Sequence, residues 1–241
     1  MKRLPLYLGH EHACPYLEGQ TARMAFIPPD LTLSLPDYSL LVANGFRRSG
    51  DLVYRTCCVS CAACIPVRIP VAEFRPNRSQ RRIARLNRAV RVIEKPAGYD
   101  DAHYQLYLRY LQVRHPESDM AKASPEDYFN FLGNIRTEGT RFCEFREDGT
   151  LLAVAVVDVL DHGFSAVYTF YAPDIQSRSP GTFAILWQIQ EAHRRGLDCV
   201  YLGFWLAGFR KMAYKSGFRP LERLIGAEWI HVRDQSPFSS P

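Results

Sequence analysis

Hydrophobic and polar positions in the second half of the chain recur with the periods of helices and strands. Tyr104, Leu108 and Leu111 are three or four residues apart, which predicts a helix over residues 99–114. Ser124 is followed by a proline and two acidic residues, a pattern that predicts the start of another helix. Two helices in succession are therefore expected before the chain turns to strands.

Three mainly apolar segments follow, separated by short turn signals, and predict an antiparallel meander. These segments are residues 141–146, 151–160 and 164–171. The later predicted elements are a helix over residues 181–195, a strand over 199–204, a short helix over 209–215 and a strand or hairpin over 222–232. By analogy, this order is that of the GNAT acyltransferase fold. We expect an α+β protein with a GNAT-like C-terminal region.

The first part of the chain predicts a smaller region that contains most of the cysteines. Its expected elements are a short helix at 39–44, a hairpin at 46–55, a strand at 67–74, a helix from Ser79 to about residue 88 and a strand at 90–93. A breaker at residues 95–98 marks a shift in composition. We therefore divide the chain into residues 1–98, 99–233 and a tail at 234–241.

Charge is distributed unevenly between these regions. Residues 1–98 hold 15 Lys and Arg against 7 Asp and Glu, whereas residues 99–241 hold 15 against 18. The first region is therefore suited to a polyanion. The chain has neither a signal-peptide pattern nor 18 consecutive apolar residues, so we expect a cytoplasmic protein with reduced thiols and no membrane partner.

Arginines follow one another closely between residues 75 and 91. They are Arg75, Arg78, Arg81, Arg82, Arg85, Arg88 and Arg91. Most are spaced by three or four, which gathers them along one helix and its flanks, with only Glu73 and Glu94 nearby. Guanidinium groups bind phosphates in a planar, bidentate way, so the stretch favours an RNA backbone. The alternative is a solvated charged helix face.

Four of the seven cysteines fall within eight positions. Cys58, Cys61 and Cys64 have the spacing C-x2-C-x2-C, and Cys14 is a candidate fourth thiolate. Such a set can hold a structural Zn²⁺ ion or an iron–sulfur cluster. His10 and His12 are alternative ligands, and small buried thiols without a metal are the other interpretation. Cys143 and Cys199 lie in apolar strands and are expected in the core.

Several motifs, in order, resemble the arginyl-tRNA–protein transferase family. The C-terminal set is residues 201–205, 211–215 and 218–222, with the sequences YLGFW, KMAYK and FRPLE. The N-terminal set is residues 14–17, 54–55, 66–69, 74–76 and 79–82 together with the cysteine cluster, and it resembles the bacterial branch. Cys57 departs from that branch and is therefore the least favoured thiol.

The resemblance implies an aminoacyl-tRNA–protein transferase. Short bacterial chains of this type move leucine from Leu-tRNA to proteins that begin with aspartate or glutamate, which marks those proteins for degradation under the N-end rule. The implied partners are a charged tRNA and proteins with an acidic N-terminus, not DNA. No cofactor is needed for aminolysis of an activated ester, and no nucleophilic cysteine is expected.

In a GNAT-like fold, the strands at 164–171 and 199–204 splay apart and hold the acyl donor. The loop at 176–181 contains a single glycine, which disfavours a CoA pyrophosphate. Arg178 and Ser179 are candidates for contact with the terminal adenosine phosphate of the tRNA, and a plain helix-capping loop is the alternative. Tyr201 and Trp205 are expected to form cleft walls and core, as substrate- or tRNA-binding residues that take no part in the chemistry.

Lys211, Tyr214 and Lys215 are the candidate catalytic residues. Lys211 and Lys215 are four apart, so an α-helix would place them on one face. Lys211, with Arg78 as second choice, is predicted to recognise the acidic side chain of the acceptor, and Tyr214 to orient the ester or donate a proton. The alternative is a surface helix with solvated lysines.

Three other functions remain open at this stage. An arginyl-tRNA–protein transferase would have the same architecture. A metal-stabilised RNA-binding protein would bind tRNA and transfer nothing. A CoA-dependent acetyltransferase would bind acetyl-CoA.

Overall fold

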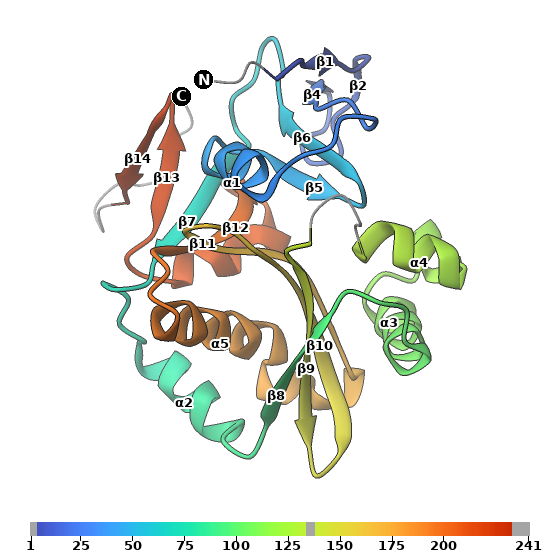
Figure 1. The fold of residues 1–241 in the computed structure, drawn as a ribbon, viewed down its shortest axis with the longest axis vertical. Helices are drawn as coiled ribbons and strands as arrows, with labels where there is room; N and C mark the ends of the chain where they lie inside the picture. Colours follow the sequence, from blue (N-terminus) through green and yellow to red (C-terminus); the bar gives the residue numbers. More distant parts are fainter. Residues whose placement is uncertain (1–3, 134–137, 233–241) are drawn as a thin grey trace.

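The computed structural model describes residues 4–133 and 138–232, and the predicted tail at 234–241 lies outside them. An eight-stranded mixed sheet, in the order β14-β13-β7-β12-β11-β10-β9-β8, forms the centre of the molecule (Figure 1). Its strands are β7 (Ile65–Pro70), β8 (Arg91–Pro96), β9 (Thr140–Glu147), β10 (Thr150–Val159), β11 (Gly163–Tyr171), β12 (Cys199–Trp205), β13 (Glu222–Ile225) and β14 (Glu228–His231). The predicted meander is confirmed as β9, β10 and β11, which pair antiparallel.

Helices cover both faces of this sheet. They are α2 (Arg78–Leu86), α3 (Asp101–Arg114), α4 (Pro125–Leu132) and α5 (Pro180–Arg194), with the 3-10 helices η1 (Asp119–Lys122), η2 (Pro173–Arg178) and η3 (Arg210–Gly217). In Figure 1, α2 and α5 lie on one side of β8–β10, and α3 and α4 on the other. Aromatic side chains make the contacts: Tyr107 of α3 packs edge-on against Phe170, and Trp187 of α5 packs against Phe145.

The N-terminal residues form two small sheets above the large one. The sheets are β1-β4-β6-β5 and β2-β3, built from β1 (Tyr7–Leu8), β2 (His12–Ala13), β3 (Thr21–Ala22), β4 (Met24–Phe26), β5 (Arg47–Ser49) and β6 (Leu52–Thr56). Helix α1 (Leu35–Ala43) lies between them and the central sheet. Buried residues of α1 and β6 share a second core with Leu160, Cys199 and Tyr201.

Local signals explain where the helices begin. Helix α1 starts earlier than predicted because Ser34 caps it and Pro36 occupies its first turn. Helix α2 is capped by Asn77 rather than Ser79, and Asn77 forms a capping box with Gln80. The short helix predicted at residues 209–215 is η3, a 3-10 helix.

Two strands from the first 98 residues belong to the central sheet. Strands β7 and β8 pair with β12, β13 and β9, so they belong to the same sheet as the later strands. The structure is thus a mixed α and β fold with one large mixed sheet. Within the residues described, no helix combines the length and apolar character needed to cross a bilayer.

Candidate active site

Strands β11 and β12 separate in the middle of the sheet. They pair in parallel through only three residue pairs, the last of which is Ser165 with Tyr201. Beyond this point the pairing between the two strands ends. A cleft of about 580 Å³ opens there, bounded by β11, α5, the end of α3 and η3. Its size and concave form are those of a ligand site.

The cleft is lined by tyrosines, by basic side chains and by the start of a helix. The tyrosines are Tyr110, Tyr168, Tyr171 and Tyr214, and the basic residues are Arg114, His115 and Lys211. Ser179, Pro180, Gly181 and Thr182 belong to the start of α5. Among the described residues that line the cleft, none is acidic. The lining therefore favours an anionic ligand with an aromatic part.

Positive charge is concentrated at one end of the cleft. Burial lowers the pKa of His115, and the charges of Lys211 and Arg114 lower it further. Helix α5 directs the positive end of its dipole toward the cleft. Its N-cap residue, Ser179, is in the left-handed conformation (φ 54°), and no side chain caps this end of the helix. The amide groups of the first turn are therefore available to an anion.

The arginine-rich helix α2 is fixed to both segments that border the cleft. At its start, the Gln80 side chain donates to the Gly217 carbonyl oxygen of η3 (3.0 Å). At its end, the Asn87 amide donates to the Arg178 carbonyl oxygen of η2 (3.0 Å). Arg75, Arg81 and Arg85 line a groove of about 570 Å³ next to α5. A polyanion along α2 would thus lie in a fixed relation to the cleft.

Sequence profiles of one family match most of the chain. The profile described as arginine-tRNA-protein transferase, C terminus, matches residues 102–225, and the corresponding N-terminus profile matches residues 12–82. The chain belongs to the arginine-tRNA-protein transferase family. The resemblance inferred from the motifs is thereby confirmed.

Relatives of this family are similar over nearly their whole length. An aspartate/glutamate leucyltransferase of Alkalilimnicola ehrlichii is 50% identical, over 96% of this chain and 97% of the relative. Proteins of the same name from Pseudomonas aeruginosa (strain LESB58) and Nitrosococcus oceani are 46% and 47% identical, over 95% of this chain and 97% and 96% of theirs. A crystal structure of FemX aligns with a TM-score of 0.48 at 9% identity, over 84% of this chain and 80% of FemX.

Of the three candidate catalytic residues, two line the cleft and one is buried beside it. Because η3 is a 3-10 helix, residues four apart do not share a face, which corrects the prediction for Lys211 and Lys215. Lys211 and Tyr214 line the cleft. Lys215 is only 5% exposed and donates to the Phe204 carbonyl oxygen. Burial, with the charge of Arg47 second, lowers its pKa to about 7.

Arg178 lies next to the cleft but faces away from its lining. Its guanidinium forms a bidentate ion pair with Glu147 (2.7 and 2.9 Å) and donates to the Asn87 side chain (3.2 Å). These contacts hold η2 against α2, and the contact of Arg178 with the donor phosphate stays a prediction. Ser179, the next residue, does line the cleft.

Tyr201 and Trp205 are mainly core residues of this transferase-family fold. Tyr201 is 7% exposed and packs against Trp229, while Trp205 is 5% exposed within the main core. Neither is among the residues that line the cleft. The structure thus places both in the core, and their contact with the substrate stays a prediction.

The four predicted metal ligands come together in the N-terminal region. Cys14, Cys58, Cys61 and Cys64 all line one small cavity of about 20 Å³, and Cys57 is not among its lining residues. The Leu17 amide donates to the Cys14 sulfur (3.4 Å). Burial raises the pKa of Cys64 to about 11, and charge on the other three thiols adds to the shift. Among the described residues, no three of these sulfurs lie within 4.8 Å of one another.

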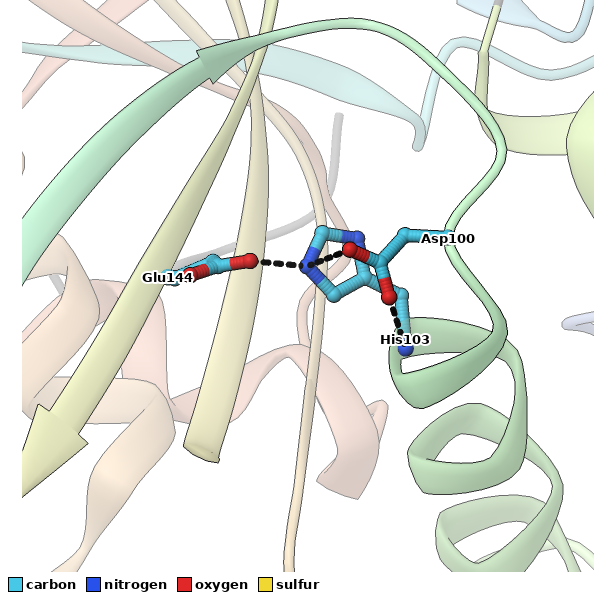
Figure 2. A group of neighbouring side chains, drawn as sticks. All are labelled: Asp100, His103 and Glu144. Carbon is cyan, nitrogen blue, oxygen red and sulfur yellow. Dashed lines mark hydrogen bonds and ion pairs between the residues drawn. The ribbon is translucent and has the colours of Figure 1, made fainter. Parts of the chain in front are cut away.

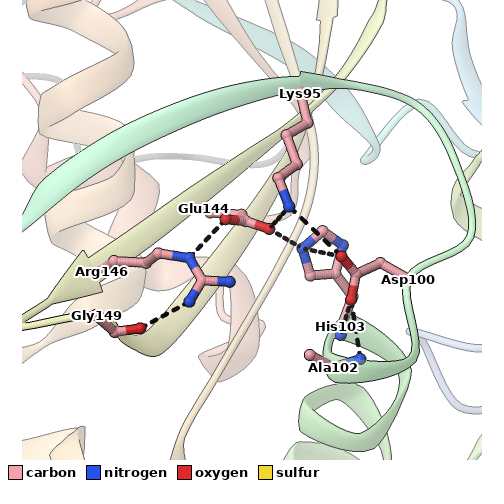
Figure 3. A network of polar contacts seen from close by, with 7 residues as sticks. All are labelled: Lys95, Asp100, Ala102, His103, Glu144, Arg146 and Gly149. Atoms are coloured by element: carbon pink, nitrogen blue, oxygen red, sulfur yellow. Dashed lines mark hydrogen bonds and ion pairs between the residues drawn. The ribbon is translucent and has the colours of Figure 1, made fainter.

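Asp100, His103 and Glu144 form a compact group that resembles a metal site. Figure 2 shows His103 of α3 and Glu144 of β9 pointing toward each other, with 2.6 Å between His Nε2 and Glu Oε1. Figure 3 shows that Lys95 and Arg146 also contact Glu144, each at 2.6 Å. These contacts hold the Glu144 pKa at about 2 despite its burial. Two resident cations satisfy this carboxylate, so the group is better suited to anchoring α3 than to a metal ion.

Arg114 and His115 are cleft residues that the sequence analysis missed. They end α3 and precede Pro116, and basic residues are common at the end of any helix because they compensate its dipole. Their residue types therefore fit an ordinary helix end as well as a binding site. Only the fold brings this end next to η3 and the start of α5.

Proposed function

We propose that the protein transfers leucine from Leu-tRNA to the N-terminal amine of proteins that begin with aspartate or glutamate, and so marks them for degradation. The observation that carries this proposal is the acid-free, tyrosine-lined cleft at the splayed strands, bordered by the arginine helix α2. Relatives about half identical over almost the full chain carry the name aspartate/glutamate leucyltransferase, which supports leucine as the transferred residue.

The donor tRNA is proposed to bind along α2 and to insert its 3′ end into the cleft. Within the described part of the chain, the arginines from Arg75 to Arg91 form no ion pairs with acidic side chains, so they remain available for phosphates. Tyr110 and Tyr168 can stack on the terminal adenine. Arg114, Lys211 and the first turn of α5 are suited to the last phosphate.

The proposed reaction is aminolysis of the ester that joins leucine to the tRNA ribose. The neutral amine of the acceptor forms a bond to the ester carbonyl carbon, the bond from that carbon to the ribose oxygen breaks, and the amine's proton leaves with the ribose oxygen. An α-amine titrates at about pH 7.7–8.0, so part of it is neutral at physiological pH. Positioning of amine and ester then supplies most of the acceleration.

Groups at the separation of β11 and β12 are placed to assist this step. Backbone N–H groups beyond Ser165, where the pairing between the two strands ends, can stabilise the developing oxyanion. Lys215 is buried beside the cleft and donates to the Phe204 carbonyl oxygen, so it is placed to position η3 against β12. Tyr214 is half-exposed in the cleft and can orient the ester. This division of roles is that of a GNAT-like acyltransferase.

The four clustered thiols are proposed to hold a structural zinc ion or iron–sulfur cluster. Four cysteines around one cavity, one of them with a backbone N–H directed at its sulfur, suit either group. We expect the purified protein to contain about one zinc or cluster per chain, measured by elemental analysis and absorbance. The double change Cys61→Ser and Cys64→Ser should abolish the metal content, whereas Cys57→Ser should retain it. Equal metal content in both variants would contradict the assignment.

Transfer of radiolabelled amino acids tests the function itself. Leu-tRNA and Arg-tRNA are each offered with peptides that begin with Asp, Glu or Ala and are otherwise identical. We expect label from Leu-tRNA on the Asp and Glu peptides and none on the Ala peptide. Absence of transfer from both tRNAs would overturn the proposal and leave the RNA-binding alternative.

Arginyl transfer is the second candidate. The family profiles that match both parts of the chain are described as arginine-tRNA-protein transferase, and the cleft's charge and shape suit either donor. Transfer from Arg-tRNA but not from Leu-tRNA in the same assay would establish this function instead.

A further inference from the structure

Arg47 is a basic residue beside the cleft that the fold leaves without an anionic partner. It lies on β5, and its guanidinium carbon is 5.4 Å from the centre of the Phe204 ring of β12. Its Nε atom is buried without a hydrogen-bond partner, and within the described residues Arg47 has no ion pair. A partly buried guanidinium is costly unless an anion compensates it, so a ligand is the expected source of the anion.

The strand beneath Arg47 is shaped to accommodate its side chain. Gly203 has a φ of 71° at an irregularity in the pairing of β12 with β7. A methyl group added at Gly203 would lie 3.3 Å from both Cζ and Nη1 of Arg47. The glycine therefore supplies the space that the guanidinium fills. This position lies just past the Ser165–Tyr201 pair, where β11 and β12 part.

The charge of Arg47 reaches two residues of η3 at the cleft. Its positive charge lowers the pKa of Lys215, after burial, and opposes the rise that burial causes in the pKa of Tyr214. Tyr214 also lines the cleft, together with Arg114 and Lys211.

We propose that Arg47 binds the side-chain carboxylate of the acceptor's first residue and so determines the preference for acidic N-termini. This inference rests on the proposed function. A guanidinium can bind a carboxylate in two parallel hydrogen bonds, and the Arg47 side chain is partly exposed and forms no ion pair among the described residues. An acceptor with an uncharged first side chain would leave that guanidinium unpaired. The cost of an unpaired charged group discriminates against a wrong acceptor more strongly than a difference in side-chain size does.

The residues that the sequence favoured for this role are better placed for the donor. Lys211 lines the cleft together with Arg114 and the start of α5, where positive charge faces the proposed phosphate. Arg78 is an exposed residue of α2 and is not among the lining residues. We therefore assign Lys211 to the donor and Arg47 to the acceptor.

The test measures transfer to two peptides that differ only in an Asp or Asn first residue. Loss of a charge-assisted hydrogen-bond pair corresponds to about a 10- to 100-fold effect. In Arg47→Gln we expect the KM for the Asp peptide to rise by about that factor, with the KM for Leu-tRNA unchanged, so that the Asp-to-Asn preference falls toward one. Arg47→Lys keeps the charge but cannot form two parallel hydrogen bonds to a carboxylate, so it should retain part of the preference. A ratio between two peptides is independent of the fraction of folded enzyme.

Arg55→Gln is the matched control. Arg55 is on the neighbouring strand β6, its guanidinium also lies over a phenylalanine ring (Phe46, 5.7 Å), and it is exposed. This control should keep the wild-type preference, and Lys211→Ala should raise the KM for Leu-tRNA without changing the preference. Wild-type preference in Arg47→Gln would overturn the inference while leaving the function intact. Absence of transfer by the wild type would overturn both.

Discussion

Replacement of Asp158 by alanine is expected to lower the free energy of unfolding by about 3–5 kcal/mol. Asp158 of β10 is fully buried, and both of its oxygens are used. Arg48 donates to them from Nε (2.7 Å) and Nη2 (2.9 Å), Tyr38 donates from its hydroxyl (2.7 Å), and Thr140 from its own (2.8 Å). The alanine variant would leave the Arg48 guanidinium buried without a counter-ion, and two hydroxyl groups without their acceptor.

This network joins the N-terminal region to the central sheet, so its loss should lower the free energy of unfolding of the whole structure. Tyr38 comes from α1, Arg48 from β5, and Thr140 and Asp158 from β9 and β10. Urea denaturation should show a lower midpoint for Asp158→Ala. Tyr38→Phe removes one hydrogen bond and should cost about 1–3 kcal/mol.

Two comparisons separate this effect from a general loss at the site. Asp161→Ala changes an exposed carboxylate on the next turn and should alter the free energy of unfolding by less than about 0.5 kcal/mol. The double variant Arg48→Met with Asp158→Leu removes both charges and should be more stable than the sum of the single losses predicts. A loss below about 1 kcal/mol for Asp158→Ala would contradict the importance we give to this ion pair.

The second large effect is expected on RNA binding. Changing Arg78, Arg81, Arg82 and Arg85 together to glutamine should weaken the affinity for charged tRNA by on the order of 100-fold at moderate salt. The plot of log affinity against log salt should become shallower by about 3, because each lost phosphate contact reduces the slope by about 0.7–0.9. Filter binding or fluorescence anisotropy at several salt concentrations measures both quantities.

The helix itself should survive these changes. Glutamine is about as good a helix former as arginine, and the Asn77–Gln80 capping box and buried Ile83 are not altered. Arg141→Gln with Arg194→Gln is the control, because each of these arginines pairs with a glutamate, Glu94 and Glu191 respectively. The control should bind within about twofold of the wild type. An unchanged salt slope in the quadruple variant would place the RNA elsewhere on the molecule.

Patterns within short segments of sequence predicted the elements and the family. The meander, the helices α3, α4 and α5 and the final hairpin follow from periodicity, caps and turn residues that act over a few neighbours. The motifs that carry the family resemblance also lie in short, contiguous stretches. Four cysteines lie around one cavity. The sequence predicted three of them from their spacing and named Cys14 as a candidate fourth.

Only the tertiary structure decided which basic residues belong to the cleft. Arg47 and Arg48 are adjacent in sequence, and no local pattern distinguishes them. Successive side chains of a strand point to opposite faces, so Arg48 meets Asp158, which is 110 residues away, while Arg47 meets Phe204 and no acid in the described chain. Likewise, Lys215 is buried and Lys211 exposed because η3 is a 3-10 helix. Partners distant in sequence, which local patterns do not encode, set the charge and exposure of these side chains.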